Sequence, residues 1–234
     1  MTEDMTGTAG PFIIAIDGPA GSGKSSVSKE IARRRGYGYL DTGAAYRALA
    51  WLVLERGGDT DDASAVLAAA DGFAPVIGLD PDVRRVIVEG TDVTAAIREP
   101  RVSAAVSGVA RIPAVRTYLN AMFHDIVASS GRTAVTIEGR DITTVVAPDA
   151  PVRILLTASP EVRATRRSKE LVGEDAASVA AALHKRDASD AAVVDFFEAA
   201  PGVEVVDSSD LDFEQTIAAV LSVVDRRSGE TYVD

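Results

Sequence analysis

A glycine-rich loop near the amino-terminus carries the clearest chemical signal in the chain. The segment IDGPAGSGKSS spans residues 16–26 and separates Gly18 by four residues from Gly23-Lys24-Ser25. An apolar run precedes the loop at 12–16, and residues 27–35 carry apolar and small residues at helical spacing. Glycines let successive backbone N–H groups turn toward one anion, and a helix amino-terminus adds the positive end of its dipole. A strand, a loop and a helix in this order therefore predict a binding site for a nucleoside triphosphate, rather than a chance glycine turn.

The loop also predicts where a metal ion would bind. We expect Lys24 to reach the β- and γ-phosphates and the Ser25 hydroxyl to coordinate Mg²⁺. The residues expected to surround the phosphates of ATP are Gly18, Pro19, Ala20, Gly21, Ser22, Gly23, Lys24, Ser25 and Ser26. The motif alone does not identify the acceptor of the phosphoryl group.

The composition excludes several classes of function. The chain has 234 residues, of which 47% are hydrophobic, enough for one α/β domain with small insertions. A net charge of −11 argues against binding to nucleic acid polymers, and no apolar run approaches the roughly 20 residues of a membrane span. Zero cysteines exclude disulfides and thiol catalysis and fit a cytoplasmic protein. His124 and His184 have no cluster of ligands around them, so we expect neither to bind a metal. Residues 1–10 are expected to be a flexible leader.

Strand patterns alternate with helical patterns along most of the chain. The expected strands are 12–17, 37–40, 133–138, 152–157 and 203–207. This alternation predicts an α/β fold, a doubly wound five-stranded parallel sheet with helices on both faces. Parallel strands bring their carboxyl ends to one edge of the sheet, where ligands bind. The polar residues expected at that edge are Asp17, Asp41, Glu138, Thr157 and Asp207.

Two segments interrupt the alternation. Residues 73–97 hold a β-branched stretch at 83–89 between turn signals at 80–82 and 90–92. This pattern predicts a small antiparallel hairpin or three-stranded sheet inserted into the chain. The second segment, 159–195, is charged and helical, so it is expected to lie outside the sheet.

Polar residues follow the second strand. Asp41 ends the strand, where it would orient a group, accept a proton or bind the waters of a metal ion. We expect Thr42 to cap the next helix. Arg47 offers a planar fork that suits a phosphate, although an Arg at this place can also be an ordinary surface residue.

A second group follows the third strand. Glu138 ends this strand at the position of the carboxylate that holds Mg²⁺ in phosphate-loop enzymes, directly or through water. Arg140 and Asp141 project past the sheet edge, toward a ligand or as an ordinary salt bridge. Ser107 is expected to end one helix, and Arg116 to lie one turn into the next helix, which restarts at a proline.

Charged residues in the 159–195 segment recur at helical spacing. Arg163, Arg166 and Arg167 share one helix face at i, i+3 and i+4, as a lid over the transferred phosphate or as a solvated basic face. Arg186 and Asp190 form a similar i, i+4 pair, which would matter most if it faced a sugar.

Taken in order, these segments resemble the bacterial cytidylate kinase family over roughly residues 12–225. The matching motifs are G-P-A-G-S-G-K-S, D-T-G-A-A-Y-R, an inserted β segment, S-x8-R, E-G-R-D-I-x-T, an Arg-rich helix and K-R-D-x-x-D. The resemblance implies transfer of a phosphoryl group from MgATP to CMP or dCMP in a cytoplasmic monomer. It also implies a single unit over 11–234, with a core at 11–41, 98–158 and 200–228, an acceptor-binding region at 42–97 and a lid at 159–190.

The resemblance assigns roles residue by residue. Arg47 and Arg140 match the family's contacts to the phosphate of CMP. Ser107, Arg116 and Asp141 match its cytosine contacts, and Arg186 and Asp190 match its sugar contacts. Arg163 and Arg167 would belong to the lid, and residues 207–210 to the adenine side. The expected catalytic set is Lys24, Asp41, Arg47, Arg140, Arg163 and Arg167, with Thr42 among the residues near CMP.

The chain departs from the family pattern at two positions. Val193 stands where a phosphate-binding Arg is expected, and Thr143 stands where Gly is usual. The missing cation predicts weaker acceptor binding or slower transfer unless another Arg compensates. Two alternatives follow, a kinase for another small acceptor such as UMP, shikimate or a deoxynucleoside, and a nucleotide-binding protein that transfers no phosphate. A GTP-binding switch would carry an N-K-x-D motif, which this sequence lacks.

Overall fold

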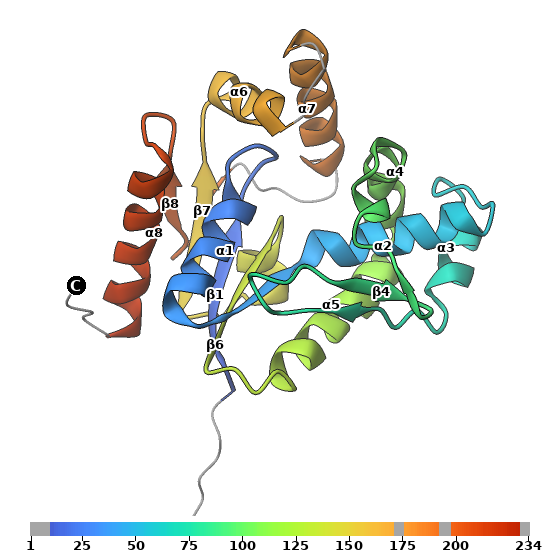
Figure 1. Cartoon of the computed structure of the whole chain (residues 1–234), viewed down its shortest axis with the longest axis horizontal. Helices are drawn as coiled ribbons and strands as arrows, with labels where there is room; N and C mark the ends of the chain where they lie inside the picture. Colours follow the sequence, from blue (N-terminus) through green and yellow to red (C-terminus); the bar gives the residue numbers. More distant parts are fainter. Residues whose placement is uncertain (1–9, 171–175, 192–197, 230–234) are drawn as a thin grey trace, which may run out of the picture.

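A five-stranded parallel sheet forms the centre of the molecule (Figure 1). The computed structural model describes residues 10–170, 176–191 and 198–229, so the predicted leader lies almost wholly outside the described residues. The strands are β1 Phe12–Asp17, β2 Gly38–Asp41, β6 Ala134–Gly139, β7 Val152–Thr157 and β8 Glu204–Asp207, in the order β2-β6-β1-β7-β8. Each predicted strand is present and ends within one residue of its predicted bounds. The predicted fold class is therefore confirmed.

Side chains of β1 alternate between the two faces of the sheet. Ile14 and Ile16 pack in a core cluster that includes side chains of α1 (Lys24–Arg35) and α8 (Phe213–Ser228). Ala15 belongs to the cluster on the other face, with side chains of α2 (Thr42–Glu55), α4 (Pro100–Ala110) and α5 (Pro113–Ala128). The period of two along a buried strand thus explains why helices cover both faces.

The inserted segment forms a small antiparallel sheet between α3 (Ala63–Ala70) and the short helix η1 (Ala96–Arg98). Its strands are β3 Val76–Ile77, β4 Val86–Val88 and β5 Thr91–Asp92. The turn predicted at 90–92 is wrong by one residue, because Thr91 pairs with Val88 and the turn is Glu89-Gly90. Both turn residues have positive φ, 49° and 79°, which matches the twist of a two-residue hairpin.

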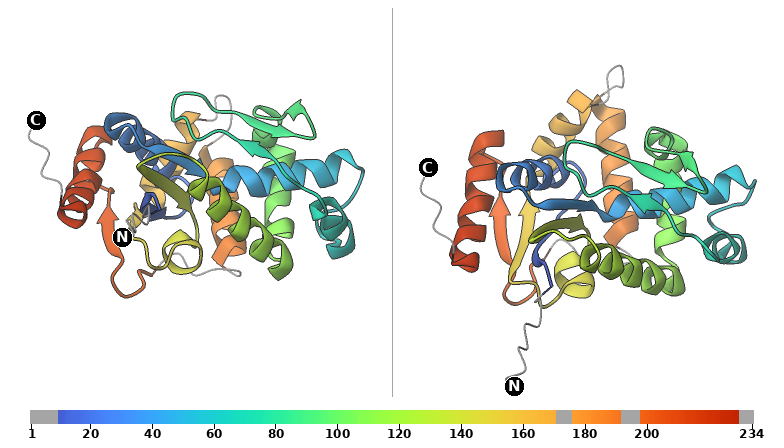
Figure 2. Two further views of the ribbon diagram at one scale, coloured as in Figure 1. Left: turned by 90° about the horizontal axis from the view of Figure 1, so that it is seen from below. Right: turned by 60° about the horizontal axis from the view of Figure 1, so that its bottom comes forward.

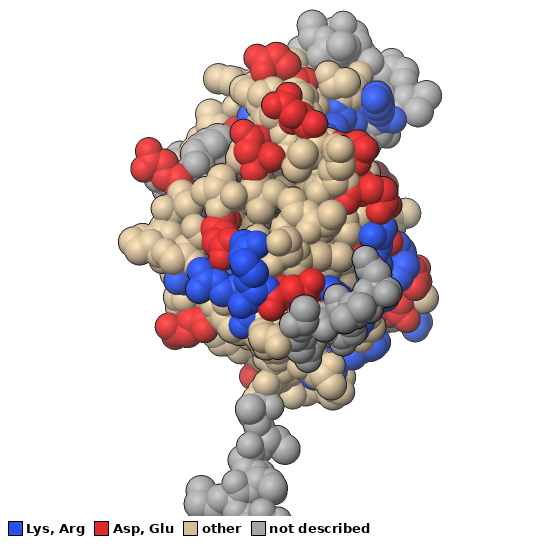
Figure 3. Space-filling model, turned by 90° about the vertical axis from the view of Figure 1, so that its left-hand side faces the viewer, with Lys and Arg blue, Asp and Glu red and all other residues tan. Residues whose placement is uncertain are grey.

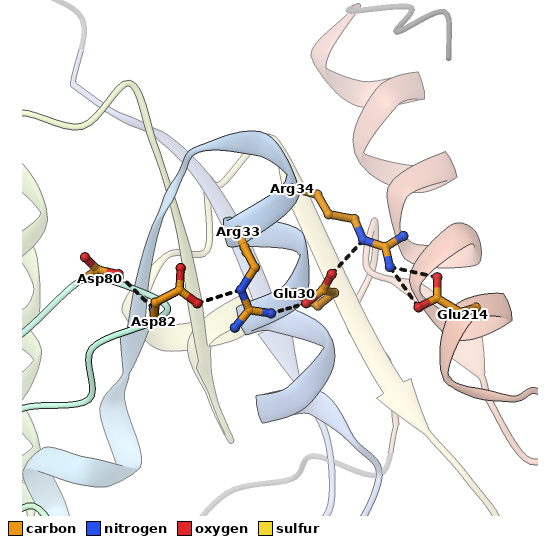
Figure 4. Close-up of polar contacts among 6 residues, drawn as sticks. All are labelled: Glu30, Arg33, Arg34, Asp80, Asp82 and Glu214. Carbon is orange, nitrogen blue, oxygen red and sulfur yellow. Dashed lines mark hydrogen bonds and ion pairs between the residues drawn. The ribbon is translucent and has the colours of Figure 1, made fainter.

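Ion pairs on α1 connect the insertion and α8 to the core, as Figure 4 shows. Arg33 binds Asp82 of the insertion with 2.7 Å between Nε and Oδ1, and it also binds Glu30. Arg34 binds Glu30 at 2.8 Å and Glu214 of α8 at 2.7 Å. These groups are largely exposed, so solvent screening keeps their contribution to stability small. Their effect is to orient the insertion and α8 against α1.

The 159–195 segment supplies two helices beyond the carboxyl edge of the sheet. They are α6 (Pro160–Glu170) and α7 (Ala176–Ala191), which lie side by side in Figures 1 and 2. A short π-helical turn, η2 (Ile142–Val146), follows β6 at the same edge. The predicted helical excursion is confirmed within the described residues.

Charged side chains of both signs are interspersed on the face turned toward the viewer in Figure 3. At the carboxyl end of α8, Arg226 and Arg227 both bind Glu204 of β8, at 2.6 Å and 3.1 Å. Because basic and acidic side chains pair in this way, this face carries charges of both signs despite the acidic net charge of the chain.

Candidate active site

The loop between β1 and α1 has a backbone conformation that requires glycine. Gly21 and Gly23 have φ of 77° and 90°, a region that side chains rarely adopt, and Gly23 caps α1. A Cβ on Gly21 would lie 2.8 Å from the carbonyl oxygen of Arg163, which is too close. Lys24 and Ser25 begin α1 directly after the glycines, so the loop ends at the unpaired N–H groups of a helix amino-terminus.

A cleft of about 370 Å³ extends from this loop along the carboxyl edge of the sheet. The predicted site residues that line it are Ala20, Gly21, Gly23, Lys24, Ser25, Ser26, Asp41, Thr42, Arg47, Ser107, Arg116, Glu138, Arg140, Asp141, Arg167 and Asp190. Four predicted residues lie outside the lining: Gly18, Pro19, Ser22 and Arg163. The side chain of Arg186, and Val193, lie outside the described residues. One cleft thus collects residues from segments far apart in sequence.

A guanidinium–carboxylate pair lies within the cleft lining. Arg116 Nη2 donates to Asp141 Oδ2 at 2.6 Å. Burial raises the pKa of the Asp141 carboxyl, and Arg116 opposes this rise. Tyr46 of α2 also lines the cleft and packs against Phe123 with 6.3 Å between ring centroids. Together with Ser107, these groups offer a planar apolar surface and directional polar groups, which suits a flat heterocyclic base.

Two arginines converge on Asp41. Its Oδ2 lies 2.8 Å from Nη2 of Arg47 and 3.5 Å from Nη2 of Arg98. Burial works against the charged carboxylate, yet the two guanidinium groups and the N–H of Ala44 hold the pKa of Asp41 below its ordinary value. Nε of Arg47 is buried without a hydrogen-bond partner in the described part of the chain. Two cations against one carboxylate leave a positive charge for a phosphate to neutralise.

Arg98 and Tyr46 are cleft residues that the sequence analysis missed. Tyr46 directly precedes Arg47, and an aromatic residue beside a predicted phosphate cation was a usable signal. Arg98 ends η1, immediately after the inserted sheet, and its side chain is 44% exposed. The sequence signal for Arg98 was a basic residue directly after the inserted segment, next to the predicted acceptor-binding region.

Arg140 connects the glycine loop to α7. Its Nη1 donates to the carbonyl oxygen of Gly18 at 2.8 Å, and its Nε donates to Oδ2 of Asp190 at 3.0 Å. The partner of Asp190 is therefore the Arg that directly follows β6. The alternative interpretation of residues 140 and 141 as a salt bridge with each other is wrong, since Asp141 binds Arg116. These two bonds place the Asp190 carboxylate of α7 beside the glycine loop.

Glu138 has an unsatisfied oxygen at the centre of the sheet edge. Its Oε1 accepts from the Tyr39 hydroxyl at 2.6 Å, whereas Oε2 is buried and has no partner within the described residues. Glu138 stands beside Asp41 in the strand register, and Ser25 lines the same cleft. A buried carboxylate oxygen without a donor is suited to a hydrated cation. These residues therefore fit Mg²⁺.

The predicted cap of α2 is wrong. Asp41, in an extended conformation, is the capping residue, and its Oδ1 accepts from the N–H of Ala44 at 2.9 Å. Thr42 is already the first helical residue, and its hydroxyl donates to the carbonyl oxygen of Glu138 at 2.7 Å. Thr42 lines the cleft, but this bond uses its proton to join β6 to α2.

Thr143, one of the two departures from the family pattern, is accommodated without strain. Its N–H and hydroxyl both donate to Oδ2 of Asp17, at 2.8 Å and 2.7 Å, and the N–H of Ile142 donates to Oδ1 at 2.9 Å. Glu89 is the single non-glycine residue with positive φ in the described chain, so Thr143 does not need the left-handed conformation. The hydroxyl adds a donor to a buried carboxylate.

The three arginines of α6 have different surroundings. Arg163 is buried, with Nη1 donating to Oδ2 of Asp187 at 2.5 Å. Nη1 of Arg166 donates to Oγ of Ser208 at 2.9 Å. Of the three, Arg167 lines the cleft. The spacing correctly predicted that the three arginines lie on one helix. The interpretation as a solvated basic face is wrong for Arg163 and Arg166, because both bind other groups of the protein.

Comparisons with known proteins identify the family. The family model described as cytidylate kinase matches residues 14–226. A cytidylate kinase of Streptomyces avermitilis is 45% identical over 229 residues, covering 97% of this chain and 98% of that protein. A cytidylate kinase of Cutibacterium acnes is 46% identical, covering 92% of this chain and 96% of that protein.

The solved structures add a likeness of fold. An uncharacterized protein from Eubacterium ventriosum superposes with a TM-score of 0.53 at 12% identity, over 92% of this chain and 99% of that one. Among the described residues, no helix has the length and apolar character needed to cross a membrane. Because the family model and the relatives each match nearly the whole chain, the chain belongs to the cytidylate kinase family.

Proposed function

We propose that this chain transfers the γ-phosphoryl group of ATP to CMP or dCMP, producing ADP and CDP or dCDP. The observation that carries the proposal is the Arg116–Asp141 pair, which lies in the same cleft as Lys24 of the glycine loop. A base-reading pair and a phosphate loop in one cleft describe an enzyme that acts on a nucleotide acceptor. The relatives named cytidylate kinase support the choice of cytosine.

Hydrogen bonding accounts for the choice of base. Cytosine presents an exocyclic amine beside the acceptors N3 and O2. Asp141 would accept from the amine, and Arg116 would donate to N3 or O2. Uracil presents an oxygen and an N–H at the corresponding positions, so its oxygen would face the carboxylate and its N–H the guanidinium. Each mismatched buried group costs about 1–3 kcal/mol.

The rest of the cleft would hold the sugar and the phosphates. Arg47 and Arg98 surround Asp41 and would bind the phosphate of CMP, with Arg140 near the glycine loop. Asp190 would accept from a sugar hydroxyl. An oxygen of the CMP phosphate attacks the γ-phosphorus in line, the new P–O bond forms, the β–γ bridging P–O bond breaks, and ADP leaves.

Charge stabilisation in this scheme comes mainly from cations. Lys24 would neutralise the β- and γ-phosphates and Arg167 the transferred group, because both line the cleft. The lid formed by α6 and α7 would cover the phosphates, exclude water and so suppress hydrolysis of ATP. Ser25 and Glu138 would hold Mg²⁺, Glu138 through water, and the ion would supply positive charge to neutralise the phosphates.

We also propose the division suggested by the family pattern. The core would be 11–41, 98–158 and 200–228, the acceptor-binding region 42–97 and the lid 159–190. We expect a monomer in the cytoplasm, and the absence of cysteine fits that compartment.

The test is formation of ADP from MgATP with CMP, dCMP, UMP or no acceptor. We expect turnover with CMP and dCMP, weak turnover with UMP, and loss of turnover in Arg116→Ala. The control is Arg226→Gln, on α8 outside the cleft lining, which should retain wild-type rates. Turnover that prefers UMP would establish the other-acceptor alternative. Binding of ATP without turnover on any acceptor would support the non-transferring alternative and point to Val193.

A further inference from the structure

Two arginines of α6 bind carbonyl oxygens of the glycine loop. Nη1 of Arg163 donates to the carbonyl oxygen of Ala20 at 3.0 Å. Nη1 of Arg166 donates to the carbonyl oxygen of Ser22 at 3.1 Å. The two carbonyl groups are alternate ones in the loop, and neither arginine is part of the cleft lining. Both side chains therefore act on the loop from outside the nucleotide site.

Because a peptide unit is planar, a bond that fixes the direction of its carbonyl group also fixes the direction of its N–H group. The C=O and N–H of one planar trans peptide point in opposite directions, and the described chain has no cis peptide bond. The carbonyl of Ala20 shares its peptide with the N–H of Gly21, and the carbonyl of Ser22 shares its peptide with the N–H of Gly23. Holding both carbonyls toward α6 turns both N–H groups away from α6. The glycines that carry them line the cleft.

Each arginine is itself fixed by further bonds. Arg163 donates to Asp187 at 2.5 Å and to the carbonyl oxygen of Ala158 at 3.2 Å, while the N–H of Ala20 donates to Asp187 at 3.3 Å. Both backbone groups of Ala20 are thus bound by one buried ion pair. Because the pair joins α6 to α7, the loop is connected to both helices.

Arg166 is fixed on the other side. Its guanidinium donates to Oγ and the carbonyl oxygen of Ser208, at 2.9 Å and 2.8 Å, and to the carbonyl oxygen of Leu211 at 3.3 Å. The planar fork spans the glycine loop and the segment after β8, a geometry that a lysine cannot reproduce. All of its acceptors among the described residues are uncharged, so its removal leaves no carboxylate of that part of the chain unpaired.

We propose that Arg163 and Arg166 are positioning residues that hold the N–H groups of Gly21 and Gly23 toward the phosphate site before the nucleotide binds. They act through carbonyl oxygens and do not contact the phosphates, whereas Arg167 faces the cleft. Both glycines have positive φ, and a glycine leaves this conformation readily because it has no side chain. By holding the loop in this conformation, the two arginines reduce the conformational entropy that the loop loses when the nucleotide binds. The inference rests on the proposed role of this loop in binding phosphates.

The experiment compares Arg166→Lys and Arg166→Gln with the wild type and with Thr165→Ala. Thr165 is exposed on the same helix, and its hydroxyl donates to the carbonyl oxygen of Glu161 within that helix, so it is a matched control. The first measurement is the amide NMR signals of Gly21 and Gly23 in nucleotide-free protein. The second is calorimetric titration with MgADP, with magnesium pyrophosphate, which carries no base, and with CMP.

We expect both Arg166 variants to shift or broaden the Gly21 and Gly23 amides and to weaken MgADP and pyrophosphate alike, by roughly tenfold or more. Affinity for CMP should change by less than twofold, and Thr165→Ala should match the wild type. A Lys variant that keeps wild-type affinity would mean a simple charge contact with phosphate. Loss of MgADP affinity with pyrophosphate spared would mean an adenine contact. Either result, or unchanged glycine amides, overturns the proposal. A wild type that does not bind MgADP would instead refute the proposed site, while the amide measurement still tests the contact.

Discussion

Replacing Asp141 by Asn tests whether this carboxylate selects cytosine over uracil. Asp141 is 7% exposed, and an ionised carboxylate can only accept hydrogen bonds. With UMP, an oxygen of the base would face it, and two acceptors would meet in a buried place. Such a mismatch costs about 1–3 kcal/mol, which corresponds to roughly 5- to 150-fold in kcat/KM. An Asn amide can accept from the amine of cytosine or, rotated, donate to the oxygen of uracil.

We therefore expect Asp141→Asn to lower the ratio of kcat/KM for CMP to that for UMP by roughly 5- to 150-fold. The value for CMP should fall as well, because Arg116 loses a charged partner at 2.6 Å. The assay is initial ADP formation at saturating MgATP with each acceptor varied. Asp82→Asn is the matched control, since Asp82 is exposed on the insertion and binds Arg33. Thermal unfolding of both variants establishes that they fold.

One result would refute this reasoning. If kcat/KM for CMP and UMP fell by the same factor, so that their ratio stayed at the wild-type value, Asp141 would serve only to hold Arg116. The base would then be selected elsewhere in the cleft.

Substitutions at four further positions follow from the geometry. Glu138→Gln keeps an acceptor for Tyr39 but removes the charge, so the Mg²⁺ concentration for half-maximal rate should rise about tenfold in a Mg²⁺ titration; an unchanged value would remove Glu138 from the metal site. Arg98→Ala should raise KM for CMP by about tenfold with KM for ATP within twofold, in steady-state kinetics. Asp41 has a lowered pKa, so its stabilising effect is present above its unfolded pKa of about 3.9 and is lost as pH falls through its lower folded pKa. The unfolding free-energy difference between wild type and Asp41→Asn, measured in urea, should therefore shrink on acidification. Thr143→Val removes a buried donor to a carboxylate oxygen and should destabilise the protein by about 1–3 kcal/mol in urea, whereas Thr143→Ser should not.

The sheet was predictable because its strands are short apolar runs between turn residues. The predicted strand 152–157 matches β7, and β2 differs by one residue at each end. The inserted sheet was less predictable, since the strand expected at 83–89 is observed at Val86–Val88. Weak alternation in a short sheet leaves the register to the turn, and the Glu89-Gly90 hairpin fixes it.

The part of the site that could be predicted is the glycine loop, where a sequence motif fixes the conformation of the backbone. The spacing of glycines in the loop predicts a conformation that few other sequences adopt, and the two glycines with left-handed φ line the cleft. Pairing partners were not predictable. Arg116 and Asp141 were both assigned to the base, but their contact with one another depends on how α5 meets η2. Arg163 and Arg166 bind carbonyl oxygens, which every residue carries, so the sequence holds no signal for these contacts.

Asp17 connects the two ends of the cleft. It is the last residue of β1, directly before the glycine loop, and its carboxylate accepts from the N–H groups of Ile142 and Thr143. Asp141, the proposed base reader, is the residue before them. The base reader and the phosphate loop are therefore held to the same buried strand end, at a fixed separation. If the loop holds ATP and Asp141 holds the base of the acceptor, this separation sets how far the acceptor phosphate lies from the γ-phosphorus. The position of ATP and the position of the base thus depend on one structural element, and Thr143, with its added hydroxyl donor, reinforces it.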